Sequence, residues 1–380
     1  MTINHYKNYL ISLILISQFI FGFAYSQEQS QIIATPLSVE GSSPHLSYDG
    51  KYLTTVSSYA TDKKNNLGRP KKFKELNLYT LSPVKKHFTA PLGLEYWLKS
   101  VSIDRNNELI ALGNQKGYVD VFNLNDGSFR FQLIPSKRKV ETFTLTKHGL
   151  KPQNRRKYDA IQSVMFSPTA DLLVTANIRG KIQVWNSKDG KLVKKIKGGL
   201  TGQQNGLFSP DGKYFALSSK LAKKVKVWSI ESGKVVDELK AKDPVKRLTF
   251  SANSKKLMII TTRQALFHDI NNKPALNMLS YTFTGDDDAV VMRSFSIIDN
   301  DNLVTSYNDG LIQLWAPQSH KVKQKFQLEL DSFELFGTKM QSEVMYSLYS
   351  KAHKQLIVKP MKGKMKLVDI SSWLDNSKAE

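Results

Sequence analysis

The side chains that could perform chemistry are few and widely spaced. After residue 26 the chain holds six histidines, and none stands in a His-Glu-x-x-His pair or at another close metal-ligand spacing: His45, His87, His148, His268, His320 and His353. There is no Gly-x-Ser-x-Gly nucleophile elbow, no glycine-rich phosphate loop and no cysteine. Thiol chemistry, disulfides and thiolate zinc sites are therefore excluded, and we expect no catalytic residue, no metal site and no cofactor.

Two carboxylate clusters are candidates for calcium binding. Asp286, Asp287 and Asp288 form a run, and Asp299 and Asp301 form a pair. Neither has the alternating ligand spacing with a central glycine that calcium loops use. The second cluster suits a hairpin turn instead, because Asp and Asn favour turn backbone angles.

Positive charge is the strongest chemical signal. The formal net charge is +22, from 55 Lys and Arg against 33 Asp and Glu. Residues 136–158 carry a net charge of +7, and residues 59–73 and 351–363 carry +4 each. A surface of this kind attracts acidic partners.

We expect the three segments to be long loops that form a basic binding arc. Its candidate residues are Lys63, Lys64, Arg69, Lys71, Lys72, Lys137, Arg138, Lys139, Lys147, Lys151, Arg155, Arg156, Lys157, Lys351 and Lys354. A set of merely solvated loops and a strand hidden inside 351–363 are the alternatives. Tyr59, Phe73, Phe143 and Tyr158 lie among these cations, and we expect them to pin the loops to the body of the protein rather than to stack on a ligand.

A repeated strand pattern must position these segments. Alternating apolar residues lead to a bulky residue seven times, as in "KIQVWNS", at Tyr79, Phe122, Trp185, Trp228, His268, Trp315 and Val368. The gaps are 43, 63, 43, 40, 47 and 53 residues, mostly near the ~40–45 residues of a propeller blade. His268 takes the place of the aromatic residue, so we expect a packed, hydrogen-bonded ring there. Ahead of most of these, two alternating strands flank a polar turn, as in "VMFSPTADLLVTA".

The units "FSPTADLLVTANIRGKIQVWNSKDGKLVKKIKG" and "FSPDGKYFALSSKLAKKVKVWSIESGKVVDEL" resemble blades of the WD-repeat propeller family. The resemblance implies an all-β, seven-bladed β-propeller of four-stranded antiparallel blades. Where the family has Trp-Asp, this chain has Trp185-Asn186, Trp228-Ser229 and Trp315-Ala316, and the usual Gly-His pair is absent. Whether the buried polar network of the family is present stays open.

We place the blades at 44–92, 95–135, 159–199, 203–240, 243–280, 281–328 and 331–371, with "FELFGTKM" as a strand of the last. Six or eight blades are the alternatives. The segment 31–39 has no blade of its own, so we expect it to supply the outer strand of the last blade and close the ring. Closure pairs strand edges that would otherwise template aggregation.

The N-terminus has the layout of a secretory signal peptide. A weakly basic head with His5 and Lys7 precedes an apolar run of about 16 residues, which is shorter than the ~20 of a membrane-spanning helix. We expect residues 1–26 to be removed and residues 27–380 to form the propeller, with the basic insertion at 136–158. An uncleaved anchor is the alternative.

These features predict an exported, periplasmic or secreted, monomeric scaffold without enzymatic activity. It would dock a protein or an acidic envelope polymer through its basic loop face. The alternative is a propeller enzyme that acts on an acidic polysaccharide or a phosphorylated substrate in the central funnel. Nucleic acid is disfavoured as a partner by the export signal.

Overall fold

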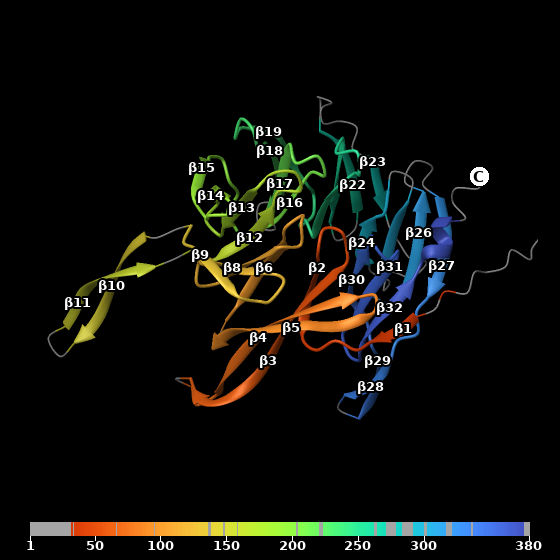
Figure 1. Cartoon of the computed structure of the whole chain (residues 1–380), viewed down its shortest axis with the longest axis horizontal. Helices are drawn as coiled ribbons and strands as arrows, with labels where there is room; N and C mark the ends of the chain where they lie inside the picture. The colour runs from red at the N-terminus through yellow and green to blue at the C-terminus, as the bar shows by residue number, and fades with distance from the viewer. Residues whose placement is uncertain are drawn as a thin grey trace, which may run out of the picture.

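The structure is a computed structural model of the chain. It describes residues 32, 34–65, 67–94, 96–135, 138–146, 149–157, 159–202, 204–219, 223–261, 264–270, 279–282, 292–299, 302–316, 321–335 and 337–375. Seven four-stranded antiparallel sheets stand around a ring, as predicted (Figure 1). The expected signal peptide at residues 1–26 lies outside the described residues.

The first four blades follow one another along the chain. The first comprises β2 (Ser42–Leu46), β3 (Tyr52–Lys64), β4 (Pro70–Leu81) and β5 (Val84–Leu94). The second comprises β6 (Leu98–Ile103), β7 (Leu109–Asn114), β8 (Val119–Asn123) and β9 (Phe129–Leu133). The third comprises β12 (Ile161–Phe166), β13 (Leu172–Asn177), β14 (Ile182–Asn186) and β15 (Leu192–Ile196). The fourth comprises β16 (Gln204–Phe208), β17 (Tyr214–Ser219), β18 (Lys224–Ser229) and β19 (Val235–Lys240).

The last three blades complete the ring. The fifth comprises β20 (Arg247–Phe250), β21 (Lys256–Ile260), β22 (Gln264–Asp269) and β23 (Leu279–Thr282). The sixth comprises β24 (Met292–Ile297), β25 (Leu303–Tyr307), β26 (Leu311–Ala316) and β27 (Lys321–Gln327). The seventh comprises β30 (Val344–Ser350), β31 (Gln355–Pro360), β32 (Met365–Asp369) and, as its outer strand, β1 (Ala34–Leu37).

The pairing of β1 confirms the predicted closure of the ring. Ala34 lies opposite Val368 and Leu37 opposite Met365, in an antiparallel register. Leu37 is buried together with Leu53 of the first blade and Leu367 of the seventh. The N-terminal strand therefore joins the two ends of the chain through both a ladder and an apolar cluster.

Hydrophobic packing between neighbouring blades forms the core. Each third strand carries the bulky residue of the repeat, as predicted, and in the fourth blade Trp228 stacks on Phe215 with ring centroids 5.2 Å apart. Both rings are fully buried, in a cluster that includes Val174 and Val184 of the third blade. Because neither sheet can cover its own apolar face, the blades must pack side by side.

Two tryptophans of the repeat make hydrogen bonds inside their own blades. In the third blade Trp185 Nε1 donates to Thr175 Oγ1, and in the sixth Trp315 Nε1 donates to Thr305 Oγ1, each at 2.9 Å. Both bonds join the third strand of a blade to its second. These two blades therefore contain a tryptophan-centred hydrogen bond although the residue after each tryptophan is not Asp.

The prediction for the seventh blade was wrong at its start and in its middle. Residues of "FELFGTKM" form a separate hairpin, β28 (Ser332–Leu335) with β29 (Thr338–Gln341), outside the blade. The segment 351–363 contains the second blade strand, β31, whose Leu356, Ile357 and Val358 are fully buried. The alternative of a strand hidden in this segment is therefore confirmed. A short helix, α2 (Ser371–Asp375), follows β32.

In the described residues, no helix has the length and apolar character needed to cross a membrane.

Candidate binding face

Strand direction gives the ring two distinct faces. The first strands of neighbouring blades contact one another, as β6 contacts β12 and β12 contacts β16, so they line the centre. Neighbouring strands of a blade run in opposite directions, so successive connections alternate between the two faces. The connection from the second to the third strand therefore lies on the same face as the connection from the fourth strand to the next blade. We call this the hairpin face, because three hairpins leave it: the outer part of β3–β4, β28–β29, and β10 (Arg138–Thr146) with β11 (Gly149–Lys157).

The segment 59–73 is the outer part of the β3–β4 hairpin, not a loop. Its ladder continues past the blade, with Tyr59 opposite Phe73 and Lys64 opposite Pro70. Four of its five candidate cations are exposed: Lys63, Lys64, Arg69 and Lys72. The fifth, Lys71, is half-buried. No described carboxylate forms an ion pair with any of the five. The charge predicted for this segment is therefore presented to solvent on a paired two-stranded ribbon.

The basic insertion between the second and third blades is also a hairpin. Strands β10 and β11 pair only with each other and extend away from the ring (Figure 1). Their register places Arg138 opposite Lys157 and Lys139 opposite Arg156. Lys137 and Lys147 lie outside the described residues, whereas Lys151 and Arg155 lie on β11. The structure thus assigns these cations to one projecting two-stranded ribbon.

Lys351 and Lys354 do not join the other candidate cations, which corrects the predicted arc. They lie in the turn between the first and second strands of the seventh blade, so they open on the opposite face. There Ala352 N donates to Asp49 O at 3.0 Å, in the corresponding turn of the first blade. Lys354 Nζ lies 2.6 Å from Asp375 Oδ1 in an ion pair. The physical reason is β31, which reverses the chain once more than the sequence analysis assumed.

The aromatic residues near the first hairpin are partly accessible. Tyr59 stacks on Phe73 at 5.7 Å between centroids, and the Tyr59 residue is 44% exposed. A hydrogen bond with Glu75 raises the pKa of Tyr59 to about 12, so the hydroxyl stays protonated. The sequence analysis did not single out Trp97, which is 52% exposed and lies under Lys74 Nζ at 4.8 Å from the ring centroid. Phe73 is half-buried, and its described ring contact is with Tyr59 on the same hairpin, so its expected role in pinning the segment to the body stays a prediction. The side chains of Phe143 and Tyr158 lie outside the described residues.

A cavity opens at the centre of the hairpin face, beside blades five to seven. It has a volume of about 360 Å³ and is lined by Lys246, Arg247, Met292, Arg293 and Tyr346, among others. These residues lie at the beginnings of first strands, where the sequence shows one or two charges ahead of apolar alternation. The sequence analysis therefore missed them.

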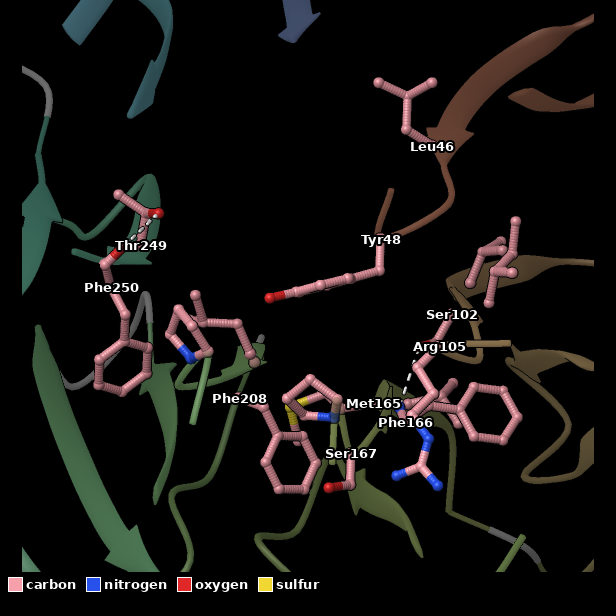
Figure 2. Close-up of a pocket in the computed structure, with 17 residues that line it drawn as sticks. Leu46, Tyr48, Ser102, Arg105, Met165, Phe166, Ser167, Phe208, Thr249 and Phe250 are labelled. Atoms are coloured by element: carbon pink, nitrogen blue, oxygen red, sulfur yellow. Dashed lines mark hydrogen bonds between the residues drawn. The ribbon is translucent and has the colours of Figure 1, made fainter. Parts of the chain in front are cut away.

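A second cavity, of about 340 Å³, lies at the centre of the opposite face. Figure 2 shows Tyr48 extending across it toward the strand that carries Thr249 and Phe250, above Phe208. Its one charged lining residue, Arg105, forms a 3.6 Å ion pair with Asp171. The cavity offers aromatic contact surface and backbone polar groups, and no described acid–base pair.

Among the described residues, His268 and Asp299 line neither cavity. The imidazole of His268 is buried and contacts Asp237, between the fourth and fifth blades and away from both cavities, so the predicted packed ring is confirmed. Asn302 Nδ2 donates to both carboxylate oxygens of Asp299, at 3.0 and 2.9 Å, as the turn hypothesis expects. The run Asp286–Asp288 lies outside the described residues. Among described residues no group of three or more His, Cys, Asp or Glu could hold a metal ion.

Comparison with known proteins identifies the architecture. No protein-family model matches the chain, and no curated protein sequence does. The β-propeller domain of Cps50 (Swd1) from Myceliophteria thermophila is similar in structure, with a TM-score of 0.63 and 9% sequence identity. The match covers 90% of this chain and 100% of that domain. At this identity the likeness shows the fold alone: a seven-bladed, WD-repeat-like β-propeller.

Proposed function

We propose that the chain is a docking protein that binds an acidic partner through its hairpin face. The observation that carries the proposal is that two cationic hairpins, β3–β4 and β10–β11, leave the same face of the ring. Arginine and lysine side chains can form charge-assisted hydrogen bonds with carboxylates, sulfates or phosphates.

The charge pattern of β10–β11 supports a ligand more than a purely structural role. Like charges directly opposite each other in an antiparallel pair repel, and here two neighbouring pairs, Arg138 with Lys157 and Lys139 with Arg156, are like-charged. An isolated two-stranded hairpin is marginally stable in water, so it has little stability to lose. An anionic partner would relieve the repulsion and stabilise the hairpin at the same time.

The partner we propose is a protein or an acidic polymer of the cell envelope. The basis is the secretory layout of residues 1–26, which would take the mature chain to the periplasm or outside the cell, where nucleic acid is scarce. We propose a monomer, because closure by β1 pairs the strand ends that would otherwise invite a second copy. An enzymatic role is not favoured, since no described histidine–carboxylate or carboxylate pair faces either cavity.

The test removes charge from one hairpin and compares it with equal removal from the opposite face. Replacing Lys137, Arg138, Lys139, Arg155, Arg156 and Lys157 with Ser should weaken capture of envelope material at least tenfold and flatten its dependence on salt. The control replaces six cations of the opposite face with Ser: Lys213, Lys234, Lys255, Lys321, Lys351 and Lys354.

Both variants lose six positive charges. A difference in their capture of envelope material therefore depends on which face carries the charge and not on the total charge. Circular dichroism and the melting temperature of each variant show whether the ring is intact. Unchanged capture by the hairpin variant, or equal loss in both, would refute the proposal.

A further inference from the structure

The cavity on the hairpin face holds an arginine that pairs with no described carboxylate. Arg247 begins β20, next to the ring centre, and its side chain lines the cavity. No described carboxylate forms an ion pair with it, and no described acceptor takes a hydrogen bond from its guanidinium. Charged side chains in such enclosed positions are normally paired.

Arg247 is half-buried, and partial desolvation of a cation that pairs with no described carboxylate is costly. Desolvation lowers the pKa of Arg247, and Tyr346 opposes that effect only in part. Arginine nevertheless keeps its charge in desolvated sites, because the charge is delocalised over the guanidinium. The free protein therefore carries a cation whose lost hydration is not replaced by any described protein group.

The groups around Arg247 leave the cavity positively charged. Arg293 Nη2 contacts Glu343 Oε2, which neutralises that cation. Lys246 also lines the cavity but has an interaction of its own, so the charge offered to a ligand is that of Arg247. Burial raises the pKa of Tyr346 to about 12, so its hydroxyl is neutral and can donate a hydrogen bond. Together these groups offer an oxyanion two kinds of donor, the guanidinium of Arg247 and the phenol of Tyr346.

We propose that this cavity is a binding site for a phosphoryl group, with Arg247 as its principal ligand and Tyr346 as a second donor. The several N–H donors of the Arg247 guanidinium, together with the hydroxyl of Tyr346, match the three free oxygens of a phosphoryl group better than the two oxygens of a carboxylate. A volume of about 360 Å³ exceeds what one such group needs, so the cavity can admit the moiety that carries it. The inference rests on the proposed function in one respect only: the phosphoryl group belongs to the acidic partner that docks on the hairpin face.

The site can be probed directly with inorganic phosphate on the full chain. We expect phosphate to raise the melting temperature and to bind measurably by calorimetry, beyond chloride at equal ionic strength and beyond acetate. Arg247→Met should weaken phosphate binding at least tenfold, and Tyr346→Phe about threefold, the loss of one hydrogen bond worth roughly 0.6 kcal/mol. Arg247→Lys should restore part of the affinity if the side chain acts through its charge.

Arg179→Met is the matched control, because Arg179 also lies on the hairpin face but pairs with Asp159 at 3.1 Å. It should leave phosphate affinity unchanged. Equal weakening by both arginine variants, equal stabilisation by chloride, or tighter binding of acetate would each overturn the phosphoryl site. So would failure of phosphate to bind the natural chain.

The two proposals fail separately. The serine variant of β10–β11 should retain phosphate binding while losing its capture of envelope material. Loss of capture in that variant, with no phosphate binding anywhere, would remove the phosphoryl site and leave the docking face. Phosphate binding that depends on Arg247, with unchanged capture, would do the reverse.

Discussion

The imidazole Nε2 of His268, on β22 of the fifth blade, contacts the carboxylate Oδ2 of Asp237, on β19 of the fourth blade. The side chain of His268 is 4% exposed and that of Asp237 is 11% exposed, so the pair is shielded from water. It joins the outer strand of one blade to the third strand of the next. It therefore acts as a polar lock in an interface that is otherwise apolar.

His268→Phe should destabilise the protein although it restores the aromatic residue typical of the repeat. The phenyl ring cannot bond to Asp237, and breaking a buried pair by removing one partner costs about 3–5 kcal/mol. The double variant His268→Phe/Asp237→Leu should recover most of that loss, because replacing both partners by apolar groups is nearly neutral. Urea unfolding of both variants measures the difference, and equal stability of the single variant and the natural chain would contradict the lock.

The two tryptophan–threonine bonds should differ in strength although their lengths are equal. Thr175→Val leaves the indole N–H of Trp185 without its acceptor in a site that is 8% exposed, which costs about 1–3 kcal/mol. Thr305→Val should cost only about 0.5 kcal/mol, because Trp315 is half-buried and water can replace the hydroxyl. Denaturant midpoints of the two variants provide the comparison. A larger loss at Thr305 would show that exposure of the indole does not set the cost.

Much of the fold was predictable from the sequence because each blade has one half-buried face per strand. Period-two alternation ending in a bulky residue located all seven third strands, including His268 and Val368. The alternation of apolar residues gave wrong predictions where the burial of side chains did not follow it. Phe333 and Leu335 alternate like a blade strand, yet Leu335 is 45% exposed in a separate hairpin. In β31 three consecutive apolar residues are buried on both sides, so no alternation was visible.

The candidate site was predictable in composition but not in position. Clusters of lysine can be counted in a sequence, whereas their face depends on the number of strands that precede them. Missing β31 inverted the face of Lys351 and Lys354. Arg247 could not be identified, because one cation at the start of an apolar strand has the same pattern whether it meets solvent or the ring centre.

Asp49 should make stability depend on acid pH. Burial acts to raise the pKa of its carboxyl, but hydrogen bonds from Ser47 Oγ, Lys51 N and Asn107 Nδ2 together outweigh burial and lower the pKa below 3.8. These hydrogen bonds to the ionised carboxylate stabilise the folded protein at pH values above the pKa that Asp49 has in the unfolded chain. Their contribution is lost as the pH falls through the lower pKa that Asp49 has in the folded protein. Asp49→Ala should therefore cost about 1 kcal/mol at neutral pH and much less near pH 3. A cost that does not change with pH, measured by urea unfolding, would assign the effect to packing.

Removal of the Leu37 side chain should open the ring at its seam. Leu37 is 1% exposed and packs with Leu53 and Leu81 of the first blade and with Ile357 of the seventh, so Leu37→Ala leaves a cavity at the one interface that local sequence does not connect. A buried Leu→Ala substitution costs about 2–5 kcal/mol. Thr35→Ala is the control, because Thr35 lies on the same strand and is exposed. Beyond the loss of stability, hydrogen exchange should quicken first in β1 and β32, since their ladder depends on this anchor. Uniform quickening across all seven blades would mean that the ring unfolds as one unit and that β1 is not a separable closure.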